Sequence, residues 1–405
     1  MDQFYLLHKN IKVLKMKIDF DFKICKITSI LNEEHLPLNM LERKTKLNLE
    51  LNRFIKNRII PKSRPNLKEI QKKYKTDDAF DLAMQSYMIS IADHYWVCPE
   101  EKIEELKWEK INFYKNNFKS DLLFVASFDT EKNIEEKINE INKTPNTSNN
   151  GSLPQMWIKE KNKIFLLKAG RKPFNQEPFN EVITSDILKL LKIKNVDYSL
   201  TNLLKMDLSK CEAFTNESIE FVPAWQFNLR EKLNHESFFD VYCKKLESYG
   251  LDKIEIKKQL QQMIISDFVF VNEDRHWGNF GVLRNSETLK IIGLAPIFDN
   301  GNSLGYMDLK IKSSILNDKS KSFGNTHERE LKFVKTLNEE WYEIPKFLPE
   351  ILERNYSKLK YPKFSKERIK EIETLINIKI KQLEMKLEKK KKIYFSKTQN
   401  KNFER

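Results

Sequence analysis

The sequence predicts an α+β fold with two lobes, a small lobe rich in strands followed by a larger, mostly helical lobe, and an additional N-terminal region in front of them. Three observations lead to this prediction. Short strand-like runs recur within residues 126–225. Helical spacing of apolar residues dominates residues 226–405. A polar, turn-prone stretch at residues 131–152 separates the first part of the chain from the rest.

Residues 1–125 are predicted to form a mostly helical accessory region that begins with a short β element. Its opening alternates apolar and polar residues in short runs, which favours strands. Apolar residues then recur at helical spacing over residues 41–60, 78–93 and 101–118. His94 precedes two aromatic residues, and we expect it to pack in an aromatic cluster and not to act as a ligand. Nothing in this region suggests chemistry.

Residues 126–225 are predicted to form the small lobe. A hairpin is expected at residues 155–168, QMWIKEKNKIFLLK, and its second strand ends at Lys168. A helix-like segment follows with Glu181 at its head. A carboxylate at this place can pair with the lysine and hold it in position. We expect Glu181 to be this partner, and Asp186 is the alternative.

Residues 226–405 are predicted to form the larger lobe, with helices at residues 237–249 and 254–266. The apolar run that follows them, before Asp274, is expected to be a strand. One long final helix is expected to begin at Ser365, after a proline. Its apolar stripe consists of Ile369, Ile372, Ile376, Leu383 and Leu387.

The residues with the clearest chemistry lie at 268–301. Asp274 follows an apolar run, Asn279 stands five residues later, and Asp299 follows a second strand-like run. Phosphoryl transfer needs one carboxylate that orients a hydroxyl group, and further oxygen ligands that hold Mg²⁺. The spacing of Asp274 and Asn279 equals that of the catalytic Asp and the metal-binding Asn in kinase catalytic loops. We predict that Asp274 orients the hydroxyl, that Asn279 and Asp299 hold the metal, and that the chain turns sharply at Gly301.

Upstream residues are placed to bind a nucleotide. Gly151 lies in a polar loop before the hairpin, where backbone N–H groups can cover phosphates. Lys168 would reach the α and β phosphates, as the third-strand lysine does in kinases. Residues 211–215 are expected to form a hinge whose main chain meets the edge of adenine. We expect His276 to shape its loop through hydrogen bonds more than to carry protons.

These residues resemble the signature of HipA-like serine/threonine kinases. The resemblance rests on residues 274–279, Asp-Arg-His-Trp-Gly-Asn, and on residues 294–299, Leu-Ala-Pro-Ile-Phe-Asp. It covers about residues 145–360 and is strong at 268–301. It implies a protein-kinase-like fold, a bacterial source, ATP and Mg²⁺ as cofactors, and a protein substrate that offers a Ser or Thr hydroxyl.

The resemblance also implies roles for individual residues. Residues 148–152 are similar to the family's phosphate loop, in which Ser148 matches a position that can be self-phosphorylated. The chain departs from the family pattern after Gly151, where it reads Ser-Leu-Pro-Gln in place of the common Gln and Lys. The residues expected to be catalytic are Asp274, Lys168 and Glu181. Those expected to bind the nucleotide are Ser148, Gly151, Ser152, Lys168, Cys211, Phe214 and His276.

Composition narrows the setting. The four cysteines are far apart and form no Cys-x-x-Cys pair, which argues against a cysteine zinc site and for a reducing compartment. We expect neither a signal peptide nor a membrane span, and therefore a cytoplasmic protein. The net charge of +14 suggests an anionic partner, although the last 25 residues carry nine Lys or Arg and only three Glu.

Three functions stay open at this point. The first is an ATP- and Mg²⁺-dependent protein kinase, which would also be able to phosphorylate itself. The second is a catalytically weak nucleotide-binding or DNA-associated regulator, which would pair with a small DNA-binding antitoxin or with nucleic acid through a basic surface. The third is a phosphatidylinositol-type lipid kinase, because Asp-Arg-His followed by an Asn is also the catalytic loop of those enzymes. The chain length and residues 294–299 favour the first function.

Overall fold

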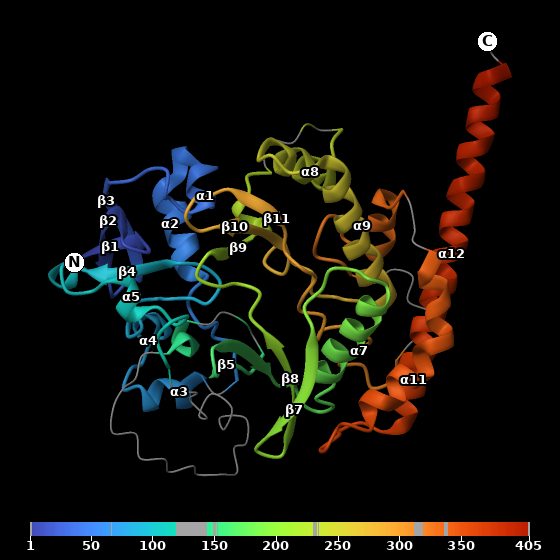
Figure 1. Ribbon diagram of the computed structural model, residues 1–405, viewed down its shortest axis with the longest axis horizontal. Coiled ribbons are helices and arrows are strands. Elements are labelled where there is room, and N and C mark those ends of the chain that lie inside the picture. Colours follow the sequence, from blue (N-terminus) through green and yellow to red (C-terminus); the bar gives the residue numbers. More distant parts are fainter. Residues whose placement is uncertain are drawn as a thin grey trace.

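In the part of the chain that the structure describes, three antiparallel sheets combine with helices that gather in the second half (Figure 1). This mixture of α and β structure confirms the predicted class in its general form. The computed structural model describes residues 2–65, 67–118, 144–148, 151, 153–229, 233, 235–311, 319–335 and 339–403.

The first sheet belongs to the N-terminal region and has the strand order β3-β2-β1-β4. Its strands are β1 (Asp2–His8), β2 (Ile11–Asp19), β3 (Ile24–Ile30) and β4 (Tyr95–Pro99). The helical elements beside it are α1 (Leu38–Leu41), η1 (Lys44–Lys46), α2 (Leu47–Lys56), α3 (Leu67–Lys73), α4 (Ala79–Met84), η2 (Glu100–Lys102) and α5 (Trp108–Ile111). β4 returns from far along the chain and pairs with β1. Apolar residues of the sheet pack with residues of α2 to form the apolar core of this region.

The N-terminal region is less helical than the sequence predicts. The helix expected over residues 78–93 ends at Met84, and Tyr87 and Met88 have φ angles of 53° and 54°, which no right-handed helix contains. The helix expected over residues 101–118 forms only the short η2 and α5. The apolar residues of that segment pack around Trp96 instead, so burial explains their spacing and helical periodicity does not.

The second sheet has the order β5-β6-β8-β7 and includes the predicted hairpin. Its strands are β5 (Gln155–Glu160), β6 (Lys163–Lys168), β7 (Tyr198–Leu203) and β8 (Met206–Glu212), with η3 (Pro145–Ser148) before them. Helix α7 (Glu177–Leu190) follows β6 and covers one face of β7 and β8. Lys168 is the last residue of β6 and pairs in register with Gln155 on one side and Ser209 on the other.

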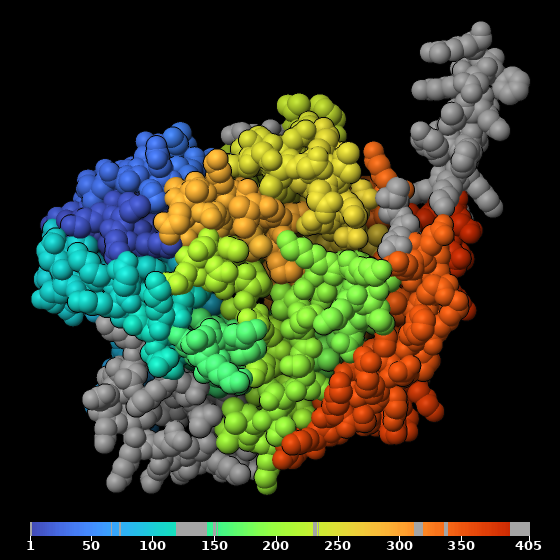
Figure 2. Space-filling model, viewed as in Figure 1, coloured from blue at the N-terminus to red at the C-terminus, as the bar shows by residue number. Residues whose placement is uncertain are grey.

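The N-terminal region shares apolar cores with the second sheet. Tyr74 and Leu82 pack with Met156 and Leu167, and a second shared cluster includes Ile164. Figure 2 shows the N-terminal region, in blue and cyan, lying directly against the later parts of the chain. The two parts are therefore held together by buried apolar surface and not by a single connecting segment.

The third sheet is small and has the order β11-β10-β9. Its strands are β9 (Ile219–Pro223), β10 (Gly281–Asn285) and β11 (Ile291–Leu294), and η4 (Ala224–Gln226) follows β9. Phe221 N donates to Ala92 O at 2.7 Å, which ties β9 to the N-terminal region.

Helices dominate the remainder of the chain and surround its largest apolar core. They are α8 (Phe238–Ser248), α9 (Lys253–Phe270), α10 (His327–Glu330), η5 (Leu331–Phe333), η6 (Glu339–Glu343), α11 (Ile344–Tyr356) and α12 (Lys366–Phe403). The expected long final helix is α12, and all five residues of its predicted stripe are buried. No helix among the described residues combines the length and the apolar composition that crossing a membrane requires.

The prediction of a strand before Asp274 is wrong, because the apolar run there forms the end of α9. Residues 263–270 are all buried, so the helix has no polar face there that would reveal its period. A short apolar run buried on all sides cannot be assigned to helix or strand by periodicity alone. The helix stops at Val271, whose left-handed backbone has a φ of 53°.

Candidate active site

A cavity of about 790 Å³ lies where the second and third sheets meet the N-terminal region. Its size is typical of pockets for small molecules and cofactors. Most of the predicted site residues line it: Ser148, Gly151, Lys168, Cys211, Phe214, Asp274, His276, Asn279 and Asp299. Glu181 lies behind the wall, where it contacts Lys168. Ser152 lies outside the described residues.

Lys168 joins two carboxylates inside this cavity. Its Nζ donates to Glu181 Oε1 at 3.0 Å and to Asp299 Oδ1 at 2.5 Å. Burial alone would lower the pKa of Lys168, but the charges of Asp299 and Glu181 outweigh it and hold that pKa well above its usual value. Burial raises the pKa of Glu181 against the opposing effect of Lys168, whereas Lys168 lowers the pKa of Asp299 in spite of burial. The lysine therefore stays charged.

Helix α7 determines which carboxylate meets Lys168. Glu181 faces Lys168 from behind the cavity wall, and its Oε2 accepts a hydrogen bond from Asn300 N at 2.8 Å. Asp186, the alternative partner, is bonded to Arg354 at 2.9 Å on another side of the helix. Five residues turn an α-helix by about 140°, so these two side chains cannot face the same partner.

The turn after Asp299 differs from the expectation. Asp299 itself has a φ of 60°, in the left-handed region that few non-glycine residues occupy. Gly301 does not have a left-handed φ, but a Cβ there would lie 3.2 Å from Glu177 Cβ and 3.4 Å from Glu181 Oε1. The glycine therefore allows the close approach of α7, and the unusual conformation falls on the predicted metal ligand, as is common at functional sites.

Asp274 is held by contacts on both carboxylate oxygens. Lys321 Nζ lies 2.6 Å from Oδ1, and Asn302 Nδ2 donates to Oδ2 at 2.9 Å. Asn279 Nδ2 donates to the backbone oxygen of Asp274 at 2.9 Å, which closes the loop between them. The carboxylate is thus fixed in direction at the edge of the cavity.

Arg275 organises the loop from underneath. It is fully buried, and its guanidinium donates to Asp267 of α9 and to Asn300 Oδ1. It also donates to the backbone oxygens of Asn279, at 2.9 Å, and of Phe298. The same side chain therefore positions the loop that holds Asp274 and the segment after β11 that contains Asp299.

His276 and the expected hinge residues have plainer surroundings. His276 is exposed, and its Nδ1 accepts a hydrogen bond from Gly278 N at 3.0 Å, as a loop-shaping residue would. Cys211 is buried, and burial raises the pKa of its thiol to about 12. Phe214 packs against Phe221 and Phe298 with ring centroids 5.5 and 5.3 Å apart. These last two positions supply an apolar wall.

The segment before the hairpin is tied to the N-terminal region. The Ser148 hydroxyl is buried and donates to the backbone oxygen of Ile89. Arg64 Nε donates to Gly151 O at 2.8 Å, and burial lowers the pKa of this arginine to about 9. Gly151 has a φ of 130°, which a residue with a side chain rarely adopts.

The sequence did not point to several residues that shape the site. Asn302 and Lys321 contact Asp274 from segments that carry no motif. The N-terminal region, in which no chemistry was expected, contributes part of the cavity wall. Its lining residues include Phe54, Asn57, Arg58, Ser90 and Asp93. Only Arg275 had a sequence signal, because it stands inside the Asp-Arg-His motif.

The donor set fits a magnesium ion. The amide of Asn279 uses its Nδ2 for Asp274 O, and among the described residues no donor faces its Oδ1. Asp299 offers a carboxylate on the same cavity. Oxygen atoms of carboxylates and amides are the ligands that Mg²⁺ takes in proteins. Asn279 Oδ1 and the Asp299 carboxylate are therefore the atoms that would hold it.

The comparisons with known proteins give similarities at low sequence identity. No protein-family model and no curated protein matches the sequence. Among solved structures, the chain is similar to the Helicobacter pylori proinflammatory kinase CtkA, with 17% identity, 58% of this chain and 94% of that chain covered, and a TM-score of 0.44. It is also similar to HipA of the Shewanella oneidensis MR-1 toxin–antitoxin system, solved with HipB and its operator DNA, with 10% identity, 94% and 97% covered, and a TM-score of 0.49. HipA is the namesake of the family that the sequence resembles.

Proposed function

We propose that this chain is an ATP- and Mg²⁺-dependent serine/threonine protein kinase of the HipA-like type. One observation carries the proposal: Lys168, Asp274, Asn279 and Asp299, from three separate segments, line a single cavity in the order and pairing that phosphoryl transfer requires. In this proposal the second sheet with α7 forms the small lobe, and the helices from α8 onwards form the large lobe.

The side chains divide the work of phosphoryl transfer. Lys168, held by Glu181, would bind nucleotide phosphates with its ammonium group. Asp274 would orient the acceptor hydroxyl and take its proton at a carboxylate oxygen, with Asn302 keeping that carboxylate in place. Lys321, 2.6 Å from Asp274, would stabilise negative charge on the transferred group. A magnesium ion held by Asn279 and Asp299 would supply neutralising charge when bound.

A transfer assay with γ-labelled ATP tests the proposal. The purified chain should label itself or a protein mixture, and Asp274→Asn should lower the rate by at least about a thousandfold while ATP still binds. Asp197→Asn is the matched control, because Asp197 is an exposed carboxylate that pairs with Lys189 and does not line the cavity. Labelling by Asp274→Asn at the control rate would contradict the assignment.

The same assay separates the two alternatives. A phosphatidylinositol-type lipid kinase would label phosphoinositide vesicles in preference to proteins. A DNA-associated regulator would turn over no ATP and would bind DNA with strong salt dependence. The net charge of +14 is the reason to measure DNA binding at several salt concentrations.

Site mapping of the labelled chain would also decide whether Ser148 is modified, since Ser148 lines the cavity. An antitoxin-like partner stays a prediction.

A further inference from the structure

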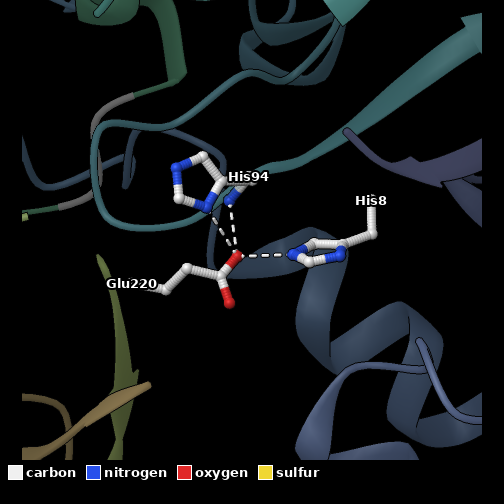
Figure 3. Close-up of side chains that lie close together, drawn as sticks. All are labelled: His8, His94 and Glu220. Atoms are coloured by element: carbon white, nitrogen blue, oxygen red, sulfur yellow. Dashed lines mark hydrogen bonds and ion pairs between the residues drawn. The ribbon is translucent and has the colours of Figure 1, made fainter. Parts of the chain in front are cut away.

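A second cluster of polar side chains lies away from the proposed kinase site, between the first and third sheets (Figure 3). His8 ends β1, His94 precedes β4, and Glu220 lies in β9. His8 Nε2 is 2.7 Å from Glu220 Oε1, and His94 Nδ1 is 2.9 Å from the same oxygen. All three side chains are at most 1% exposed. Two imidazole rings therefore converge on one carboxylate oxygen inside the protein.

The contacts of His94 fit a cation beside Glu220. Its Nε2 faces the backbone oxygen of Asn216 at 3.0 Å, and a carbonyl oxygen can only accept. A neutral imidazole has one ring proton, so a proton on Nε2 leaves Nδ1 with a lone pair that points at the carboxylate. Two lone pairs at 2.9 Å repel each other. A metal cation placed between Nδ1 and the carboxylate oxygen would remove this repulsion.

Both rings have the outer contacts that metal ligands usually have. His94 Nε2 faces a backbone carbonyl, and His8 Nδ1 lies 2.9 Å from His35 Nδ1. Ligand histidines in metal sites almost always use their other ring nitrogen in this way, which orients the ring. The other carboxylate oxygen of Glu220, Oε2, accepts a hydrogen bond from Arg284 Nε at 2.9 Å, so the orientation of the carboxylate is also fixed.

We propose that His8, His94 and Glu220 bind a divalent transition metal ion of the zinc type. Two imidazole nitrogens and one carboxylate oxygen are a common donor set for such ions. The three ligand atoms lie within 4.8 Å of one another, and moving them apart by about half an ångström would give ordinary zinc–ligand distances near 2.0 Å. A polar cavity of about 490 Å³ is lined by His8 and His35 but not by His94 or Glu220, so an ion would enter from the side of His8.

The charges around the cluster allow a metal ion to bind, and also to be removed again. Burial alone would raise the pKa of Glu220, but Arg284 and His8 outweigh it and hold that pKa well below its usual value, so the ligand is ionised. The positive charge of Arg284 opposes the ion and lowers its affinity. Because the three ligands come from two sheets and from positions far apart in the chain, the ion would fasten the N-terminal region to β9.

Metal analysis of the full chain tests this proposal. After loading with Zn²⁺ and dialysis, the chain should retain one zinc per molecule by mass spectrometry, and its melting temperature should rise. His8→Gln and His94→Asn each keep a side-chain nitrogen near the position that faces Glu220, but each should lose the zinc and the shift in melting temperature. His235→Gln, an exposed histidine elsewhere, and Asp299→Asn, in the proposed magnesium site, should retain both.

Two results would overturn the proposal. The first is wild-type protein that binds no zinc at micromolar concentrations. The second is zinc that persists in both histidine variants, which would place the ion elsewhere. Loading with Co²⁺ gives an independent readout, because a tetrahedral nitrogen and oxygen site produces visible absorption bands that His94→Asn should abolish. Kinase activity enters neither measurement.

Discussion

Lys168 Nζ lies 2.5 Å from Asp299 Oδ1, so the proposed phosphate-binding lysine contacts a proposed metal ligand directly. Glu181 Oε1, on α7, lies 3.0 Å from the same Lys168 Nζ. One buried cation thus balances two carboxylates that would otherwise repel each other. When magnesium and nucleotide bind, the lysine and the ion would share Asp299, and this coupling makes Lys168 central to both binding and stability.

We expect Lys168→Met to lower γ-phosphate transfer at least about a hundredfold and to destabilise the fold by about 3–5 kcal/mol, because a buried pair loses one partner. Urea unfolding measures the stability. The double variant Lys168→Met/Glu181→Gln should be less destabilised than the single variant, since one uncompensated charge is removed. Lys163→Met, at an exposed position of the same strand, is the control. If Lys168→Met and Lys163→Met were equally stable, the proposed role of Lys168 would be contradicted.

Lys321 is expected to act in the transfer step. Its side chain is 55% exposed although it contacts Asp274, so its removal should cost little stability. Lys321→Ala should lower kcat by about ten- to a hundredfold with the KM for ATP nearly unchanged. Steady-state kinetics measure both quantities. Lys332→Ala, an exposed lysine nearby, should behave like wild type, and a change in KM alone would assign Lys321 to binding instead.

Arg275 should be far more important for stability than a surface arginine. Its side chain and that of Asp267 are both fully buried. Arg275→Leu leaves that carboxylate without its counter-ion and should cost about 3–5 kcal/mol of unfolding free energy. Arg354→Leu breaks the half-exposed pair with Asp186 and should cost about 0–1 kcal/mol. Similar losses in the two variants would mean that Arg275 does not organise the loop.

His327 predicts acid sensitivity. Burial, with smaller effects of Lys379 and Arg275, lowers the pKa of this histidine to about 3 from an unfolded value near 6.5. The unfolded chain therefore binds the proton first, and the contribution of His327 is present above pH 6.5 and lost as the pH falls towards 3. Between pH 7 and pH 4 this amounts to about 3 kcal/mol.

Urea unfolding at several pH values measures this effect. His327→Gln should lose less stability than wild type between pH 7 and pH 4, because glutamine does not titrate. His235→Gln, which changes an exposed histidine, should follow the wild-type profile. Parallel profiles for wild type and His327→Gln would show that this histidine is not the source of the acid sensitivity.

Much of the candidate site could be predicted from the sequence, because its signals are local. The five-residue spacing of Asp274 and Asn279, and the lysine at the end of a hairpin strand, are visible in short windows. Glu181 could be preferred to Asp186 by its place at the head of a helix. Contacts such as Lys321 with Asp274 have no such signal, since 47 residues separate the two positions.

The sequence by itself determined the order of the candidate site residues, the mixture of α and β structure, and the long final helix with its buried stripe. Only the tertiary structure decided that the run before Asp274 is helical, that the left-handed turn falls on Asp299, and that the N-terminal region helps to form the cavity. The reason is physical: periodicity records which face of an element is buried, and it carries no information where every face is buried or where the partner lies in a distant segment.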